Sequence, residues 1–466
     1  MKPDTHETVR EAMGRLKTGN LQLDAILGGG FPANSINIVM GEPGSGKTIL
    51  AERLVFANAD PEGRAILYLT TLSEPLEKVV RYLQQFSFFD ESRLGHPITY
   101  DSIGEGLVEK GIRSIVPRLK EAITADKPKI IVIDSFKAIH DLATAVPEMR
   151  QMLFEMAGLL TAYETTAFLL GEYNAAEVAH YPEFAVADAI VELNRTKTTS
   201  RDERYLRVLK LRGSSYREGL HAFRISSAGL DVSPRLISPS TPPAYRLQAE
   251  RVPTGVEGLD RMLDGGLPQG RTTFLMGTTG SGKTTLALQF VLEGLRRGEK
   301  CLYVNFEENP SQLAQQIHSL GMDPRQAEAK GLQFIYRSPV ELQIDSIVSE
   351  IFAIVAKGGI RRVVIDGVGD LQIAASDVER LHDYLYALAQ HFAVRDAVAL
   401  FTYETTYDTR RDMQTRLSAL ADNIIRLDIE LDGRARRTIR IIKARGLEHD
   451  LEKREVQITR QGVRVT

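Results

Sequence analysis

Cysteine is nearly absent from this chain, because Cys301 is the only one among 466 residues. A lone cysteine excludes an intrachain disulfide and a zinc site built on cysteines. Long apolar runs are also missing, since none approaches the roughly 20 residues that a bilayer-spanning helix needs. Residues 1–18 are polar and charged, which argues against a signal peptide. We therefore expect a cytoplasmic protein without membrane association.

A strong excess of one charge is missing too, because the formal net charge is only −3. A chain with this balance has no global attraction to nucleic acid or to anionic membranes. Its composition, 43% hydrophobic and 26% charged, is that of an ordinary globular protein. At this length the chain can form two domains, each large enough to bury a core of its own.

One stretch carries a chemical signature: Gly277-Thr278-Thr279-Gly280-Ser281-Gly282-Lys283-Thr284. Its form, G-x-x-x-x-G-K-[ST], is that of the phosphate-binding loop, whose backbone N–H groups surround the phosphates of a nucleotide. The lysine reaches the β- and γ-phosphates, and the threonine hydroxyl binds Mg²⁺. An apolar strand at 272–276 precedes the loop, and a helix follows it. The predicted nucleotide-binding residues are Gly277, Thr279, Gly280, Ser281, Gly282, Lys283, Thr284 and Thr285.

The same loop occurs a second time, as Gly41-Glu42-Pro43-Gly44-Ser45-Gly46-Lys47-Thr48, 236 positions earlier. The stretches before the two loops also match, at 15–32 and 251–268. The chain is therefore a tandem duplication. We predict an N-terminal segment at 1–14, a first domain at 15–232, a Pro- and Ser-rich linker at 233–249 and a second domain at 250–466. The predicted nucleotide-binding residues of the first domain are Gly41, Gly44, Ser45, Gly46, Lys47 and Thr48.

Each copy has the order strand, phosphate loop, helix, strand, helix, strand. Residues 65–69 match 301–305 as a second strand, and 129–134 match 362–366 as a third. Their nearly continuous β-branched runs are typical of strands that are covered on both faces in a parallel sheet. The predicted fold class is α/β, with two tandem P-loop NTPase domains, each a mostly parallel sheet flanked by helices.

An aspartate ends the third strand of each copy. An acidic group at this place can hold Mg²⁺ through water, beside the threonine of the phosphate loop. A strand-ending aspartate alone is usually a turn or cap residue, but its place downstream of a phosphate loop favours the metal role. The predicted Mg²⁺ ligands are Thr48 with Asp134 and Thr284 with Asp366.

The two copies differ where activation of water is expected. The second copy has two adjacent carboxylates, Glu307 and Glu308, after a strand, and one of them can accept a proton from the attacking water or hydroxyl. A solvated acidic helix start is the competing interpretation, chiefly for Glu308. In the first copy Leu72 and Ser73 replace the pair. We therefore expect the first domain to bind nucleotide well and to hydrolyse it poorly.

A basic strand recurs near the end of each copy, with Lys210 and Arg212 in the first and Lys443 and Arg445 in the second. Strand alternation places each Lys-Arg pair on one face, where it can contact the phosphates of a neighbouring nucleotide. Such cations stabilise charge that develops on the γ-phosphate. The alternative is a solvated edge strand that charge protects from aggregation.

These features together resemble the KaiC family: two RecA-like domains, two phosphate loops, Phe306-Glu307-Glu308 and two K-x-R-G strands. The resemblance implies a hexameric ATPase and autokinase with ATP between subunits. It also implies that the strand-borne cations, with His449, reach the nucleotide of the adjacent subunit. A KaiB-like or signalling protein partner would fit this class. The chain ends soon after its last strand, so we expect a homologue without the C-terminal tail of the clock members.

In that family the second domain phosphorylates a Ser-Thr pair of its own. Ser418 matches the serine, and Ala419 takes the place of the threonine. The resemblance therefore implies one phosphoacceptor, Ser418, and no stepwise two-site cycle.

Two alternatives remain open at this stage. A RecA-like DNA repair or recombination ATPase would need basic DNA-binding loops, but the segment after Asp134 is not notably basic, so DNA is an unlikely partner. A nucleotide-switched signalling scaffold with little turnover is the other, and the altered motif of the first copy supports it.

Overall fold

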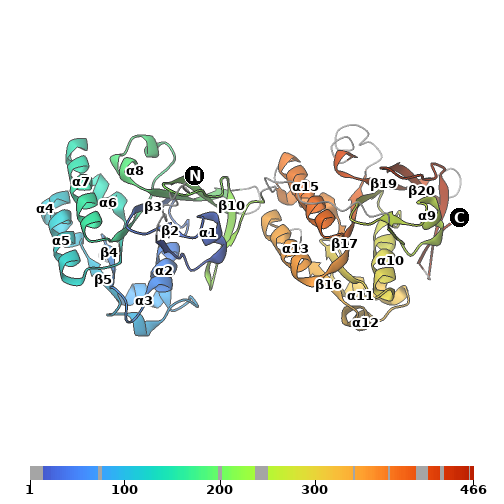
Figure 1. The fold of residues 1–466 in the computed structure, drawn as a ribbon, viewed down its shortest axis with the longest axis horizontal. Helices are drawn as coiled ribbons and strands as arrows, with labels where there is room; N and C mark the ends of the chain where they lie inside the picture. Colours follow the sequence, from blue (N-terminus) through green and yellow to red (C-terminus); the bar gives the residue numbers. More distant parts are fainter. Residues whose placement is uncertain are drawn as a thin grey trace, which may run out of the picture. The chain divides into compact units, whose positions relative to one another are not determined.

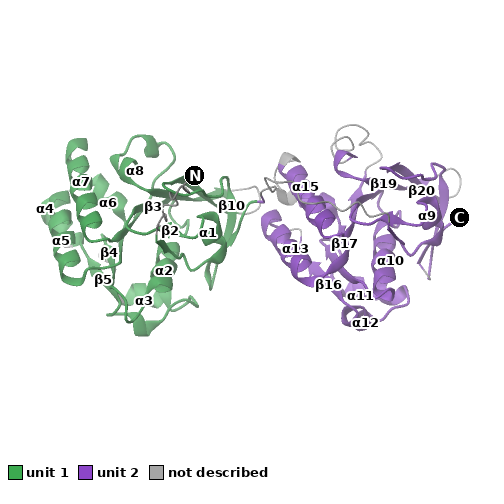
Figure 2. Ribbon diagram, in the orientation of Figure 1, with its two compact units in different colours: residues 1–235 green, residues 236–466 purple. Residues whose placement is uncertain are grey.

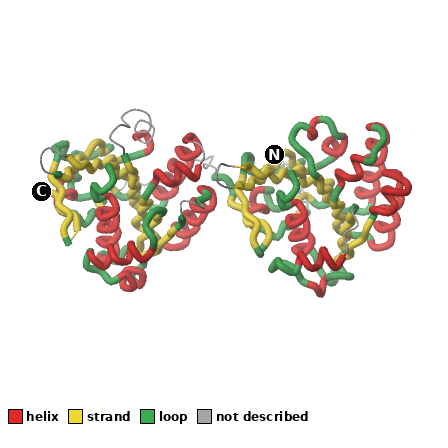
Figure 3. The backbone as a smooth tube through the Cα atoms, turned by 180° about the vertical axis from the view of Figure 1, so that it is seen from behind, coloured by secondary structure: helices red, strands yellow, loops and turns green. Residues whose placement is uncertain are grey.

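The computed structural model describes residues 14–71, 76–197, 202–236, 250–338, 342–375, 378–405, 418–430, 435–460 and 462–466. The chain divides into two compact units, residues 1–235 and 236–466 (Figures 1 and 2). Each unit contains one nine-stranded sheet with helices on both faces (Figure 3). The predicted α/β class with two tandem, mostly parallel domains is confirmed.

The sheet of unit 1 has the strand order β11-β10-β9-β8-β3-β7-β6-β4-β5. Neighbours from β8 to β5 are parallel, and β9 to β11 extend the sheet in antiparallel fashion. The strands are β1 Arg15–Leu16 and β2 Phe31–Pro32, which form a separate ladder, then β3 Ile36–Gly41, β4 Ile66–Thr70, β5 Ile98–Ser102, β6 Ile130–Asp134, β7 Thr166–Gly171, β8 Ala189–Lys197, β9 Asp202–Leu211, β10 His221–Ser226 and β11 Gly229–Ser233.

The helices of unit 1 are α1 Leu21–Ile26, α2 Lys47–Asn58, α3 Leu76–Leu83, α4 Gly104–Lys110, α5 Ile115–Asp126, α6 Phe136–Asp141, α7 Val146–Ala162 and α8 Pro182–Val186. Successive side chains of a strand point to opposite faces of the sheet. Accordingly Val39 packs with residues of α2, whereas Ile38 and Met40 pack with residues of α5 and α7. Both faces are therefore apolar, as the continuous hydrophobic strands predict.

The sheet of unit 2 has the order β16-β15-β17-β18-β14-β19-β20-β21-β22. Its strands are β14 Thr272–Gly277, β15 Lys300–Asn305, β16 Leu332–Tyr336, β17 Ile360–Asp366, β18 Val398–Glu404, β19 Asn423–Glu430, β20 Arg436–Ala444, β21 Arg454–Thr459 and β22 Gly462–Val465, with a separate ladder of β12 Arg251–Val252 and β13 Leu267–Pro268. Its helices are α9 Glu257–Met262, α10 Lys283–Arg296, α11 Pro310–Ser319, α12 Pro324–Ala329, α13 Ile344–Gly358, α14 Val368–Ala375 and α15 Val378–Val394.

The duplication is visible in three dimensions, because the repeated Thr-Gly…Leu-Asp stretch makes the same contacts in both units. Asp24 accepts hydrogen bonds from the Thr18 backbone N–H at 2.8 Å and hydroxyl at 2.9 Å. Asp260 accepts the equivalent bonds from Thr254 at 2.7 and 2.8 Å. A carboxylate that accepts two such bonds fixes the turn that leads into α1 or α9. The sequence match at this place therefore reflects a structural constraint.

Most of the predicted linker, residues 237–249, lies outside the described part of the chain. No helix among the described residues combines the length and apolar character that crossing a membrane requires.

Candidate active site

The phosphate loop of unit 2 joins β14 to α10. Gly280 and Gly282 have φ of 76° and 103°, the left-handed conformation that glycine adopts readily. Lys283 donates to the backbone oxygens of Gly277 and Thr278, each at 3.0 Å. Burial lowers the pKa of Lys283, while the charges of Glu404, Asp366 and Glu307 act in the opposite direction. The ammonium thus lies in a loop shaped to receive phosphate.

The phosphate loop of unit 1 has the same geometry. Gly44 and Gly46 have φ of 71° and 103°, and Lys47 donates to the carbonyls of Gly41 and Glu42, each at 2.9 Å. Only glycine fits at position 41, because an added Cβ would lie 2.0 Å from the carbonyl oxygen of Leu193. A nucleotide phosphate fits this cradle, since the buried Ser45 hydroxyl has no hydrogen-bond partner among the described residues and a Cβ added at Gly44 would meet open space.

The two strand-end aspartates lie beside these loops. Asp134 accepts hydrogen bonds through Oδ2 from Thr48 at 2.8 Å and from the Tyr68 hydroxyl at 3.0 Å. Burial raises the pKa of Asp134, and these two hydrogen bonds oppose that effect. The predicted pair of Thr48 and Asp134 is therefore in direct contact.

In unit 2 the aspartate has different partners. Asp366 accepts from Tyr303 through Oδ2 at 2.7 Å and from Thr402 through Oδ1 at 2.5 Å. Thr284 and Asp366 line the same cavity, which places the predicted metal pair around one space.

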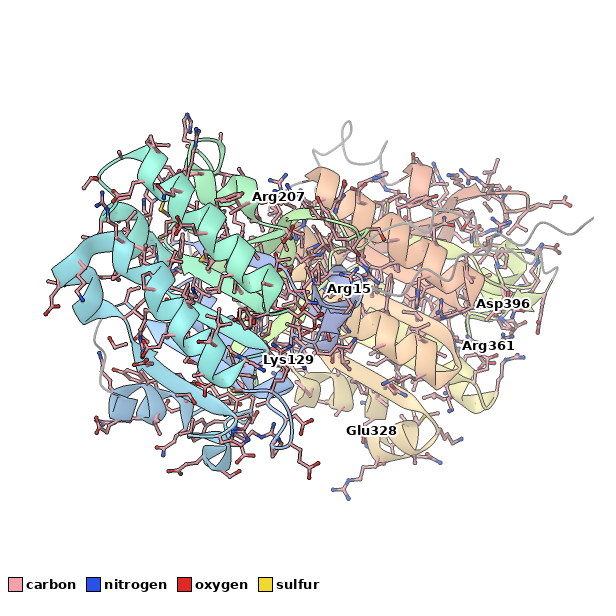
Figure 4. The ribbon with its side chains drawn as sticks, turned by 60° about the vertical axis from the view of Figure 1, so that its left-hand side comes forward. Arg15, Lys129, Arg207, Glu328, Arg361 and Asp396 are labelled. Atoms are coloured by element: carbon pink, nitrogen blue, oxygen red, sulfur yellow. The ribbon has the colours of Figure 1, made fainter. Side chains whose placement is uncertain are left out.

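That cavity has a volume of about 290 Å³. It brings together the phosphate loop, both predicted glutamates and the aspartate. Its lining residues are Thr279, Gly280, Gly282, Lys283, Thr284, Thr285, Asn305, Glu307, Glu308, Gln316, Asp366, Gly367, Thr402, Glu404 and Ile458. The phosphate loop, the two glutamates and the aspartate follow or end β14, β15 and β17 at the carboxyl edge of the parallel strands, whereas Arg361 lies near the start of β17 at the opposite edge (Figure 4).

The two glutamates of this cavity differ in how they are held. Gln316 of α11 donates to both carboxylate oxygens of Glu308, at 3.0 and 2.9 Å. Glu307 is exposed as a residue, but partial desolvation of its carboxylate in the cavity and the negative charges of Asp370, Asp366 and Glu404 raise its pKa. A carboxylate with a raised pKa accepts a proton more readily. The pKa of Glu308 is raised by burial too, but Gln316 occupies both of its carboxylate oxygens, so Glu307 is better suited to act as a base.

The equivalent place in unit 1 follows from the sheet register. Thr70 lies opposite Asp134, as Asn305 lies opposite Asp366. Two residues beyond Thr70 is Leu72, so this register supports the alignment of Leu72 with Glu307. Residues 72–75 themselves lie outside the described part of the chain.

Comparison with known proteins identifies the family. A family model described as "ATPase: KaiC" matches residues 16–237 and 252–466. The chain belongs to the KaiC ATPase family. It is 27% identical over 458 residues to the circadian clock oscillator protein KaiC of Picosynechococcus sp., a match that covers 95% of this chain and 88% of that protein. It is 26% identical over 475 residues to the circadian clock protein KaiC3 of Synechocystis sp., covering 98% and 92%.

One acidic residue of this KaiC-family site is missed by the sequence analysis. Glu404, at the end of β18, lines the unit 2 cavity and accepts a hydrogen bond from the Thr279 hydroxyl at 2.5 Å. Glu172 follows β7 at the matching place in unit 1, and its charge favours the protonated form of Lys47. A glutamate at the end of the same strand in both copies is the signal that could have found it.

The lysines of the two basic strands contact backbone carbonyls outside the phosphate loops. Lys443 donates to the carbonyls of Ser418 and Ala421, the latter at 2.8 Å. Lys210 donates to the carbonyls of Phe184, at the position that matches Ser418, and of Ala185, each at 3.3 Å. The residues that line the unit 2 phosphate-loop cavity do not include Lys443, Arg445 or His449.

The cations that follow these strands differ in their contacts. Arg445 lies just after β20 and is exposed, whereas Arg212 follows β9 and pairs with Asp188 at 3.3 Å. His449 contacts the carbonyl of Leu447 at 3.1 Å.

The predicted phosphoacceptor lies in a short helical stretch at 418–420. The contacts of Lys443 and Lys210 make Ser418 the counterpart of Phe184 in unit 1, and Phe184 is only 3% exposed. Unit 1 therefore has a buried aromatic ring where unit 2 has a hydroxyl.

Unit 1 also contains a buried acid that the sequence analysis misses. Glu52 of α2 is 1% exposed and accepts a hydrogen bond from the Tyr100 hydroxyl at 2.7 Å. The Tyr100 ring stacks on Tyr68 with centroids 5.2 Å apart. Burial raises the pKa of Glu52 from 4.5 to about 8. In unit 2, Leu288 is the counterpart of Glu52 by sequence position, and Phe334 is the counterpart of Tyr100 by sheet register.

This burial predicts a pH dependence of stability. Between pH 5 and 8 the unfolded chain releases the Glu52 proton that the folded unit retains, so the free energy of unfolding of unit 1 falls as pH rises and levels off above about pH 8. The Glu52→Gln variant lacks this titrating group. The free energy of unfolding of the variant minus that of the parent should therefore rise with pH, by on the order of 4 kcal/mol. Urea unfolding at several pH values measures it, with Glu62→Gln as the exposed control. A constant difference between Glu52→Gln and the parent would contradict the assignment.

Proposed function

We propose that this KaiC-family chain binds ATP with Mg²⁺ at both phosphate loops and hydrolyses it mainly in unit 2. One observation carries the proposal: Lys283, Thr284, Asp366 and Glu307 line the same cavity. Together they offer a cation for the phosphates, two oxygen groups for Mg²⁺ and a carboxylate for the attacking water. Phosphoryl transfer needs little more than this positioning and charge stabilisation.

The residues of the chain divide the work as follows. Backbone N–H groups of the loop and the Lys283 ammonium bind the β- and γ-phosphates. Thr284 and Asp366 would hold Mg²⁺, since their oxygens line the same cavity. The metal, when bound, neutralises charge that develops on the transferred phosphoryl group. Glu307 accepts the proton of the attacking water.

Unit 1 is proposed to bind nucleotide and turn it over slowly. Its loop, lysine and aspartate match those of unit 2, which supports binding. The residue aligned with Glu307 is Leu72, which cannot accept a proton. Among the described residues of this unit, Glu172 is an exposed carboxylate that directly follows a strand of the site.

Assembly belongs to the same proposal. The resemblance implies a homo-oligomer, a hexameric ring with ATP between subunits. The exposed Arg445, placed outside the cavity of its own unit, supports a role at the nucleotide of a neighbour. Arg207 on β9, labelled in Figure 4, is another exposed cation on the equivalent strand of unit 1. A KaiB-like or signalling protein would be the further partner.

Autophosphorylation of Ser418 is proposed as a second activity of unit 2. Lys443 contacts the Ser418 carbonyl, and Ala419 and Leu420 line one cavity with Arg445. A neighbouring nucleotide that Arg445 reaches would therefore also lie close to the Ser418 segment. Glu307 or Glu308 of that neighbour would accept the hydroxyl proton.

The hydrolysis proposal predicts the effect of one isosteric change. Glu307→Gln keeps the size of the side chain and removes the base, so steady-state ATP hydrolysis should fall by about 10²-fold or more while ATP affinity stays within a few fold. Phosphate release and equilibrium nucleotide binding measure the two quantities.

Glu308→Gln is the matched control for this change, since Gln316 already occupies both oxygens of Glu308. It should retain most of the activity. Full activity in Glu307→Gln, or equal loss in both variants, would show that the pair is structural.

The kinase proposal predicts a phosphate on Ser418 after incubation with ATP and Mg²⁺. Peptide mass spectrometry locates it, and Ser418→Ala should abolish it without reducing ATP hydrolysis. A phosphate found only on Thr415, outside the described residues, or nowhere in this segment would leave an ATPase without the kinase step.

A further inference from the structure

In each unit a tyrosine donates a hydrogen bond to the aspartate that is proposed to hold the metal, and no sequence motif indicates this contact. Tyr68 of β4 donates to Asp134 at 3.0 Å, and Tyr303 of β15 donates to Asp366 at 2.7 Å. Both tyrosines are at most 2% exposed. Each hydroxyl lies deep in the protein and points at the carboxylate.

The sheet explains why the same contact arises twice. Tyr303 lies in register opposite Val364, and Asn305 lies opposite Asp366, two residues further along the same face. The tyrosine ring runs along the strand under α10, so its hydroxyl ends at the carboxylate. Tyr68 lies opposite Val132 in the same way, two residues before Asp134.

Other contacts of these aspartates are not shared between the units. Thr402 donates to Asp366, but Leu170 occupies the matching place opposite Asp134. Thr48 donates directly to Asp134. Because these other contacts differ between the units, the tyrosine–aspartate hydrogen bond is a contact that both sites share. We therefore relate it to the ligand that both sites are proposed to bind, a nucleotide with its metal.

We propose that Tyr68 and Tyr303 are positioning residues, whose hydroxyls fix the carboxylates of Asp134 and Asp366 in the orientation that receives the metal of the bound nucleotide. The inference rests on the proposed nucleotide binding and adds to it the group that orients the metal ligand. A buried carboxylate that keeps only one of its two donors, Thr402 for Asp366 or Thr48 for Asp134, has more freedom to rotate about its Cβ–Cγ bond. A partner in the outer shell removes that freedom before the metal arrives, and such partners typically change metal affinity.

The experiment uses the full chain in two backgrounds, so that each site is read alone. In the Lys47→Ala chain only the unit 2 loop keeps its lysine and binds nucleotide, and in the Lys283→Ala chain only the unit 1 loop does. Tyr303→Phe is added to the first background and Tyr68→Phe to the second, because phenylalanine keeps the ring and removes only the hydroxyl. Mn²⁺ binding in the presence of a non-hydrolysable ATP analogue is measured by electron paramagnetic resonance. Binding of the analogue without metal is measured separately.

The expected result is a loss of Mn²⁺ affinity of about 10-fold in each tyrosine variant, with affinity for the metal-free analogue unchanged within about 2-fold. Tyr100→Phe in the Lys283→Ala background is the matched control, because its hydroxyl contacts Glu52 and not the aspartate. It should leave Mn²⁺ affinity unchanged.

Two results would overturn the inference. One is Mn²⁺ affinity unaltered in both tyrosine variants, and the other is an equal loss of metal-free analogue binding, which would indicate a distorted loop. Failure of the proposed function looks different: the Lys47→Ala and Lys283→Ala chains, before any tyrosine change, would bind neither the analogue nor the metal.

Discussion

The contact on which both sites depend is that of a buried lysine ammonium with two carbonyls of its own phosphate loop. Burial lowers the pKa of Lys283, and the charges of the carboxylates at the strand ends oppose that effect. Lys47 is balanced in the same way by Glu172 and Asp134. Because parallel strands end at one edge, a single sheet supplies the loop, the lysine and the acids together. The fold therefore brings one cation and several anions to the place where we propose that phosphates and a metal bind.

The parts of the site that could be predicted are those that a strand end or a loop encodes locally. The phosphate loops, Asp134, Asp366 and the Glu307-Glu308 pair are of this kind, because their position follows from the residues next to them. Tyr303 could not be found in this way, since its hydroxyl meets Asp366 only through the register of two strands. The Glu52–Tyr100 pair likewise joins a helix to a strand 48 residues later.

The duplication shows which contacts the fold requires and which have diverged. The Thr-Asp turns before α1 and α9, the loop geometry and the tyrosine–aspartate bonds recur in both units. The Glu52, Thr402 and Glu307 positions differ: Thr402 contacts Asp366, Glu307 lines the cavity with the phosphate loop, and Glu52 interacts electrostatically with Asp134. The two units thus differ beside the site while the loop geometry that holds the phosphates is the same in both. This pattern supports two binding sites of unequal turnover.

The most direct test of this account counts bound ATP and measures hydrolysis in the same two loop variants. We predict about two ATP per chain in the parent and about one in either Lys47→Ala or Lys283→Ala. Hydrolysis should persist in Lys47→Ala, in any assembly that still forms, and should be lost in Lys283→Ala. Hydrolysis that survives in Lys283→Ala and disappears in Lys47→Ala would contradict the account, because it would place the catalytic site in the unit without the glutamate pair.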